Sequence, residues 1–308
     1  MQLSPLPRSR FEQWRAGVRD RLVARNRQAG LRIGADAEVY ADRFVSGLLP
    51  QGARTRTASI LTIAHRGREV GTVWVGINRA RAFIVDLDLA IADAPIGDLY
   101  PAIEGFVRAR GAVRLSIALF PGDAAVRRLI DGRGFATASI QMLLEPLPRR
   151  RERLDIDVSP MTAERFAGYV TTTEAAFARD LAASGRATAD EAVKEAARQL
   201  RAELPDGLDT PGQSLFTASV GGVEVGTLWV GARLRGDRPH AFVLDVEVAE
   251  AYRRRGYGRQ LMLAAEREAR AIGADSVGLH VFGVNEGAIA LYEQLGYRRV
   301  EEMLFRDL

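Results

Sequence analysis

The stretch Val246-Glu-Val-Ala-Glu-Ala-Tyr-Arg-Arg-Arg-Gly-Tyr-Gly-Arg259 joins two segments of different periodicity. Alternation over Ala241–Val248 predicts a strand, and the apolar spacing from Gly258 to about Ile272 predicts a helix. Gly256 and Gly258 let the backbone turn tightly and approach a ligand closely. The first amides of the helix then point at one place, where the helix dipole and the arginines favour an anion. The stretch therefore predicts a pyrophosphate site, with a ligand-free glycine turn as the alternative.

The rest of the second half predicts a mixed sheet covered by helices. A helical stretch over about 160–200 comes first, and a hairpin turns at Gly221-Gly222 between the strands Ser214–Val220 and Val223–Val230. Later elements are a strand at Val277–Phe282, a helix from Glu286 to about Leu295 capped by Asn285, and a final strand near 298–306. This plan is an α/β fold of the α+β kind, with a mixed, mostly antiparallel sheet.

The chain also contains an internal repeat. Glu69–Gly76, Glu-Val-Gly-Thr-Val-Trp-Val-Gly, matches Glu224–Gly231, Glu-Val-Gly-Thr-Leu-Trp-Val-Gly, at an offset of 155. The offset rises to 159 and then to 162 where loops are expected, and further matches keep the chain order: Phe11 with Phe166, Asp86 with Asp245, Phe120 with Phe282, and Gly134-Phe135 with Gly296-Tyr297. The repeat predicts two tandem domains, 1–150 and 151–308, joined near Pro146–Pro160.

Composition excludes several classes of site. The absence of cysteine excludes disulfides, thiolate metal sites and a cysteine nucleophile. The three histidines are too scattered to suggest a zinc site, so we expect no metal. No apolar run is long enough to span a membrane, and the start lacks a secretory leader. We therefore expect a cytoplasmic protein without membrane contact.

The charge is unevenly distributed between the halves. Residues 1–150 hold 23 arginines and 14 acidic residues, a net charge of +9, whereas residues 151–308 have a net charge of −5. The basic half could attract nucleic acid, but its arginines are spread out and no helix-turn-helix or zinc-finger pattern accompanies them. We expect no nucleic-acid partner.

Two motifs of the second half together resemble the GCN5-related N-acetyltransferase (GNAT) superfamily. Arg253-x-x-Gly256-x-Gly258 is similar to the acetyl-CoA pyrophosphate loop of that family, and Asn285-Glu-Gly-Ala-Ile-Ala-Leu-Tyr-Glu-Gln-Leu-Gly-Tyr297 is similar to its last conserved helix. The resemblance is strong over roughly 214–305, and the repeat extends it to two tandem GNAT-like domains, each with a parallel strand pair that splays apart. It implies an acetyl-CoA-dependent N-acetyltransferase in which an amine attacks the thioester directly.

The resemblance also implies roles for individual residues. The pantetheine arm lies between the strands Ala241–Val248 and Val277–Phe282, where main-chain groups of Val246 and Val248 pair with it and the Val246 N–H stabilises the oxyanion. Tyr292 matches the tyrosine that protonates the departing thiolate near the cofactor, with core packing as the alternative. Asn285 matches a residue that contacts the arm, with capping as the alternative. The expected pyrophosphate residues are Arg253, Arg254, Arg255, Gly256, Tyr257, Gly258 and Arg259.

Two residues are candidates for the general base. Alternation places Asp245 and Glu247 about 7 Å apart on one face of the strand with Val243, and Phe242, Leu244, Val246 and Val248 on the other. Glu247 could accept the proton in a desolvated setting, and His280 on the next strand could do so as an imidazole; alternatively, both only line the acceptor pocket. Asp245 is interpreted as structural, because its counterpart Asp86 persists in the first half.

The first half is predicted to be degenerate and non-catalytic. Its loop Ala90–Asp98 lacks the glycine pair and the arginine run, Asp93 and Asp98 would repel a phosphate, and Pro95 removes an amide donor. In place of the second half's Tyr292 and Asn285, the first half has Ile130 and Asp123.

The sequence does not identify the molecule that accepts the acetyl group. A small-molecule amine is the leading expectation, and the acidic second half mildly favours a cationic one. A peptide or protein amine is the alternative within the same chemistry. A CoA-binding regulator without turnover is the alternative outside it, against which Tyr292 argues. The protein is expected to be a monomer or a homodimer.

Overall fold

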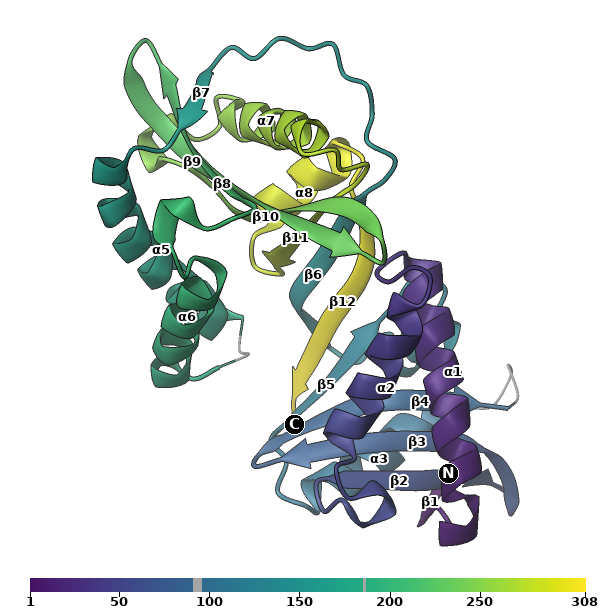
Figure 1. Ribbon diagram of the computed structural model, residues 1–308. Coiled ribbons are helices and arrows are strands. Elements are labelled where there is room, and N and C mark those ends of the chain that lie inside the picture. Colours follow the sequence, from purple (N-terminus) through teal and green to yellow (C-terminus); the bar gives the residue numbers. More distant parts are fainter. Residues whose placement is uncertain (91–95, 185–186) are drawn as a thin grey trace. The chain divides into compact units, whose positions relative to one another are not determined.

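The computed structural model describes residues 1–90, 96–184 and 187–308. Its contacts divide the chain into two compact units (Figure 1). Unit 1 consists of Met1–Thr137 and Val300–Leu308, and unit 2 consists of Ala138–Arg299. Among the described residues, no helix combines the length and the apolar character that crossing a membrane requires.

Unit 2 contains six neighbouring strands in the order β6–β11–β10–β9–β8–β7. The strands are β6 (Ala136–Leu144), β7 (Asp157–Pro160), β8 (Gln213–Val220), β9 (Val223–Arg235), β10 (Arg238–Val248) and β11 (Val277–Phe282). Only the β10–β11 pair is parallel. The helices are α5 (Ala163–Ala183), α6 (Ala189–Glu203), α7 (Tyr257–Ala271) and α8 (Glu286–Gln294).

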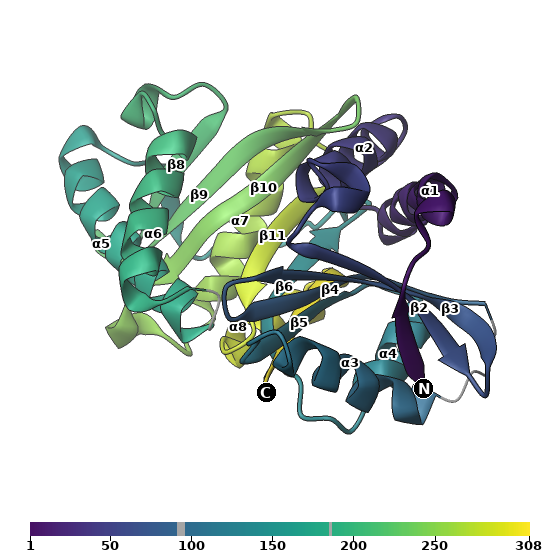
Figure 2. The same ribbon diagram turned by 90° about the horizontal axis from the view of Figure 1, so that it is seen from below.

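Unit 1 repeats this plan in the order β1–β2–β3–β4–β5–β12. The strands are β1 (Gln2–Pro5), β2 (Ala58–His65), β3 (Arg68–Asn78), β4 (Arg81–Leu89), β5 (Arg114–Leu119) and β12 (Arg298–Asp307). The helices are α1 (Phe11–Ala29), α2 (Asp36–Leu48), α3 (Leu99–Arg108) and α4 (Ala124–Ile130). The β4–β5 pair is parallel, and Figure 2 shows α1 and α2 on one face of this sheet with α3 and α4 on the other. The predicted mixed α/β fold is therefore confirmed in both repeats.

The last strand of each sequence repeat belongs to the unit formed by the other repeat. β6 ends the first repeat and pairs antiparallel with β11 from Leu144↔Val277 to Ser139↔Phe282. β12 ends the second repeat and pairs antiparallel with β5 from Leu119↔Glu302 to Arg114↔Asp307. The division at residue 150 follows the sequence repeat, whereas the compact units follow this exchange. A chain cut at residue 150 would leave each half without one strand of its sheet.

Two apolar cores lie on opposite faces of the unit 2 sheet. The larger contains the buried faces of α7 and α8, including Leu261 and Tyr292, and the smaller contains Tyr169 of α5 against Trp229 of β9. The expected helical stretch over 160–200 consists of two helices, because Thr188 forms a capping box with Glu191 and starts α6. The expected hairpin turn at Gly221-Gly222 is confirmed, with both glycines at positive φ.

The predicted faces of the strand Ala241–Val248 are wrong in one respect. The β9–β10 register shifts between Val243 and Asp245, which places a β-bulge at Leu244. Beyond it, Val246 and Val248 pack with Val243 in the core beneath α7 and α8, whereas Leu244 packs in the core beneath α5. One extra residue in a strand reverses the alternation after it, so Val246 and Val248 do not share a face with Leu244.

Candidate functional site

The site in unit 2 begins where β10 and β11 separate. The two strands pair only from Ala241↔Val277 to Val243↔Leu279, although β10 continues to Val248 and β11 to Phe282. Past the bulge, Val246 and Val248 still pair with β9 on their other side, opposite Leu228 and Gly226. The edge of β10 that faces β11 therefore has main-chain groups that can pair with an extended ligand.

The glycine-rich turn between β10 and α7 is built as expected for an anion site. Gly256 is the N-cap of α7 at φ 87°, and the first turn of this helix contains neither a side-chain cap nor an acidic residue. Arg254 is also left-handed, at φ 62°. A Cβ on Gly258 would lie 3.3 Å from Leu291 Cδ2, so a larger residue would crowd the start of the helix. The first amides of α7 therefore point away from the helix without internal partners.

The arginines of the turn have different surroundings. Arg253 Nε donates to the Val248 carbonyl at 3.1 Å, which ties the turn to the end of β10. Arg259 pairs with Glu152 at 2.9 Å, and the Arg255 guanidinium lies 5.5 Å from the centre of the Tyr252 ring. Because these side chains have partners within the protein, the main-chain amides of the turn are the groups most available to an anion. This main-chain cradle fits a pyrophosphate.

Asn285 caps α8 and Tyr292 lies on it, as the sequence predicts. Asn285 Oδ1 accepts the hydrogen bond of the Ala288 amide at 3.2 Å and so caps the helix. Tyr292 is 6% exposed, and burial, with a smaller effect of the Asp245 charge, raises its pKa to about 12. A phenol with this pKa stays protonated at neutral pH, as a proton donor to a thiolate requires.

Glu247 and His280 are both exposed and lie on neighbouring strands that diverge. Glu247 lies opposite Thr227 of β9, and His280 lies opposite Gln141 of β6. The His280 ring is 5.8 Å from the Phe282 ring, which in turn is 6.1 Å from the ring of Phe177 on α5. Both candidate bases therefore lie on the side of the sheet that α5 covers.

Asp245 has a more unusual setting than the sequence suggests. Tyr169 Oη of α5 donates to Asp245 Oδ2 at 2.9 Å. Burial, together with the charges of Glu247 and Asp180, raises the pKa of Asp245 to about 6, against the opposing effect of the Tyr169 hydrogen bond. Sequence reasoning missed Tyr169, which is 76 residues from Asp245. The two positions are brought together only when α5 packs on the sheet.

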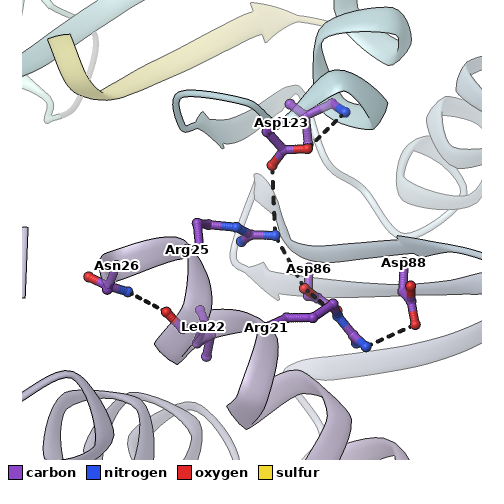
Figure 3. A network of polar contacts seen from close by, with 8 residues as sticks. Arg21, Leu22, Arg25, Asn26, Asp86, Asp88 and Asp123 are labelled. Carbon is purple, nitrogen blue, oxygen red and sulfur yellow. Dashed lines mark hydrogen bonds and ion pairs between the residues drawn. The ribbon is translucent and has the colours of Figure 1, made fainter. Parts of the chain in front are cut away.

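The counterpart of Asp245 in unit 1 is surrounded by arginines from α1 (Figure 3). Arg21 Nη2 donates to Asp86 Oδ2 at 2.6 Å, and Arg21 Nη1 donates to Asp88 Oδ2 at 2.8 Å. Arg25 Nη2 lies 3.5 Å from Asp86 Oδ1 and 3.7 Å from Asp123 Oδ2. Asp123 is the N-cap of α4, so Arg25 connects β4 to α4 where β4 and β5 separate.

The phosphate-loop counterpart in unit 1 is described only in part. Asp93 and Pro95 lie outside the described residues. Asp98 is the N-cap of α3, where a carboxylate opposes binding of a phosphate. Among the residues that the structure describes, no group of three His, Asp or Glu side chains is arranged to hold a metal ion.

Several known proteins are similar to this chain in sequence or in fold. The pattern of the family described as "Acetyltransferase (GNAT) family" matches residues 181–297. The uncharacterized N-acetyltransferase YycN of Bacillus subtilis (strain 168) is 31% identical over 156 residues, which cover 50% of this chain and 100% of that protein. Mycothiol acetyltransferase of Nocardiopsis dassonvillei is 39% identical over 103 residues, 32% of this chain and 31% of that protein. The crystal structure of a GCN5-related N-acetyltransferase from Sphaerobacter thermophilus has the same fold, with a TM-score of 0.52, 15% identity and coverage of 99% of this chain and 95% of that one.

Proposed function

Because this chain belongs to the GNAT family of N-acetyltransferases, we propose that it transfers the acetyl group of acetyl-CoA to a primary amine of a small molecule, and that unit 2 performs the reaction. The carrying observation is the parallel pair β10–β11, which separates after three residue pairs and leads into the glycine turn at Gly256. An extended thioester arm fits against the unpaired edge of β10, and its pyrophosphate fits at the start of α7.

The residues of unit 2 support direct attack by the amine. The Val246 amide is proposed as the donor to the thioester oxygen, and one preorganised donor of this kind lowers a barrier by about 3 kcal/mol. Tyr292 is proposed as the acid that protonates the thiolate, since it lies on α8 at the family's position and its phenol is protonated at neutral pH. Glu247 and His280 remain the candidate proton acceptors. Both are exposed beside the diverging strands, so solvent can carry the proton away.

Unit 1 is proposed to be a non-catalytic partner. The Arg25 guanidinium lies between Asp86 and Asp123, beside the separating strands, and fills space that an acceptor would need. Ile130 in α4 replaces the acid, and Asp98 starts α3 with a negative charge. Each of these features opposes the binding of acetyl-CoA or the chemistry that follows.

The test measures acetyl-CoA binding and thiol release on the full chain. Calorimetry should give one acetyl-CoA per chain, and a panel of amines should reveal acceptor-dependent release of CoA thiol. Gly256→Val should weaken acetyl-CoA binding, because a side chain at φ 87° is strained by about 1–2 kcal/mol. The matched change in unit 1, Gly97→Val, should leave binding unchanged. Two acetyl-CoA molecules per chain, or equal effects of the two changes, would refute the assignment to unit 2.

A further inference from the structure

The helices α1 and α5 are equivalent, residue for residue. Arg10 pairs with Glu69 in unit 1 and Arg165 pairs with Glu224 in unit 2, and both pairs obey the offset of 155. A Cβ on Gly52 would meet the ring of Phe11, as a Cβ on Gly207 would meet the ring of Phe166. These matched contacts place Arg21 of α1 at the position of Ala176 and Arg25 at the position of Asp180.

Unit 1 therefore shows what this position of the fold can bind. The guanidinium of Arg25 lies between the carboxylates of Asp86 and Asp123, and 5.2 Å from the centre of the Phe120 ring. A carboxylate and an aromatic face are a common environment for an organic cation. The counterparts of Asp86, Phe120 and Asp123 in unit 2 are Asp245, Phe282 and Asn285.

Unit 2 retains the carboxylate and the ring but has lost the cation. Ala176 and Asp180 replace both arginines, so the charge contributed by the helix changes from positive to negative. Among the described residues, Tyr169 is the side chain that hydrogen-bonds Asp245, and no arginine forms an ion pair with Asp245, Glu247 or Asp180. The Asp180 charge is close enough to influence Asp245. Arg165 is close enough to influence Glu247, and Arg179 to influence Asp180, but neither forms an ion pair with them, so Asp245 and Asp180 are left for a ligand to neutralise.

We propose that Asp245 and Asp180 bind the ammonium group of the acceptor, in the place that the Arg25 guanidinium fills in unit 1. This inference rests on the proposed function, since it names the amine that unit 2 acetylates. The proposed class of acceptor is an aliphatic amine without a neighbouring carboxylate, because a carboxylate beside the amine would be repelled by both aspartates. Amines of this class carry a positive charge at neutral pH.

The test compares amines that differ only by a carboxylate. The pairs are phenethylamine with phenylalanine, tyramine with tyrosine, and 1,5-diaminopentane with lysine. The dissociation constants are measured by calorimetry on the full chain loaded with CoA. In at least one pair, the amine should bind at least tenfold more tightly than its amino acid. Amines that bind no better than their amino acids in all three pairs would overturn the inference.

The decisive variant transfers the unit 1 residue into unit 2. Asp180→Arg should weaken binding of the preferred amine by tenfold or more and leave acetyl-CoA binding within twofold, because the arginine would take the place of the ammonium. Asp180→Asn removes the charge without adding a cation and should weaken binding by about threefold. The matched control is Asp157→Arg on the exposed strand β7, three strands from β10. This variant should change neither the affinity for the amine nor the affinity for acetyl-CoA.

The two proposals fail in different ways. If Asp180→Arg binds the amine as tightly as the unchanged chain, the cation site is wrong, whatever the activity. If the amine binds as expected but no thiol is released from acetyl-CoA, the cation site stands and the acetyl transfer assigned to unit 2 fails.

Discussion

Replacing Arg21 by methionine should destabilise unit 1 by about 3 kcal/mol. The Asp86 side chain is 1% exposed and receives its short hydrogen bond from Arg21 at 2.6 Å. Removing one partner of a buried ion pair costs about 3–5 kcal/mol, because the other charge stays buried without compensation. Arg25 remains 3.5 Å from Asp86, so the lower end of this range applies. A change of this size lowers the melting temperature by roughly 6–12 °C at about 2–4 °C per kcal/mol.

Tryptophan fluorescence can report this change from unit 1 alone. The chain has three tryptophans, and Trp14 and Trp74 lie together in the unit 1 core with α1, their rings 5.4 Å apart. Trp229→Phe therefore provides a background in which urea unfolding monitors unit 1. The matched control is Arg19→Met on the same helix, where the pair with Asp42 is solvent-exposed and should contribute little to stability.

A double-mutant cycle separates the ion pair from packing. In Asp86→Asn the buried charge is gone, so adding Arg21→Met should cost much less than it does beside the charged aspartate. Arg21→Met could lower the free energy of unfolding by less than about 1 kcal/mol, or by the same amount with Asp86 and with Asn at position 86. Either result would show that the arginines do not compensate the Asp86 charge.

Further outcomes concern unit 2. Because the pKa of Asp245 is raised to about 6 from 3.8, the folded chain keeps this proton after the unfolded chain has released it. The free energy of unfolding should therefore fall by about 2–3 kcal/mol as pH rises from about 4 to about 6. Urea unfolding of Asp245→Asn should not show this fall. A difference in unfolding free energy between the two chains that does not change with pH would contradict the expectation. Tyr292→Phe should lower turnover by about 100-fold or more with acetyl-CoA binding within twofold, and an unchanged rate of thiol release would remove Tyr292 as the acid. Of Glu247→Gln and His280→Ala, the variant that leaves the pH–rate profile unaltered identifies a residue that is not the base.

Much of the fold was predictable from short-range sequence signals. Alternation and apolar spacing predict β10, α7, β11 and α8 within a few residues, because side-chain direction repeats with the period of a strand or a helix. The glycines and arginines of the 253–259 turn and the cap Asn285 are local motifs whose function needs only neighbouring backbone. The repeat likewise identified a second copy of the fold.

Other features depend on contacts that no local pattern encodes. The bulge at Leu244 changes which residues share a face of the strand. One extra residue in a strand does not alter the local sequence pattern enough to be recognised. The exchange of β6 and β12 depends on which of two similar strand edges each of them pairs with, and no short-range sequence signal specifies that choice.

The sequence by itself determined two copies of one fold and, in the second copy, a glycine turn between a strand and a helix. Only the tertiary structure showed that Asp86 and Asp245 differ, because Arg21 and Arg25 reach the first and Tyr169 reaches the second from helices more than 60 residues away. The physical reason is range: periodicity and turn chemistry act between neighbours along the chain, whereas the charge around a buried carboxylate is set by whichever helix packs on its strand.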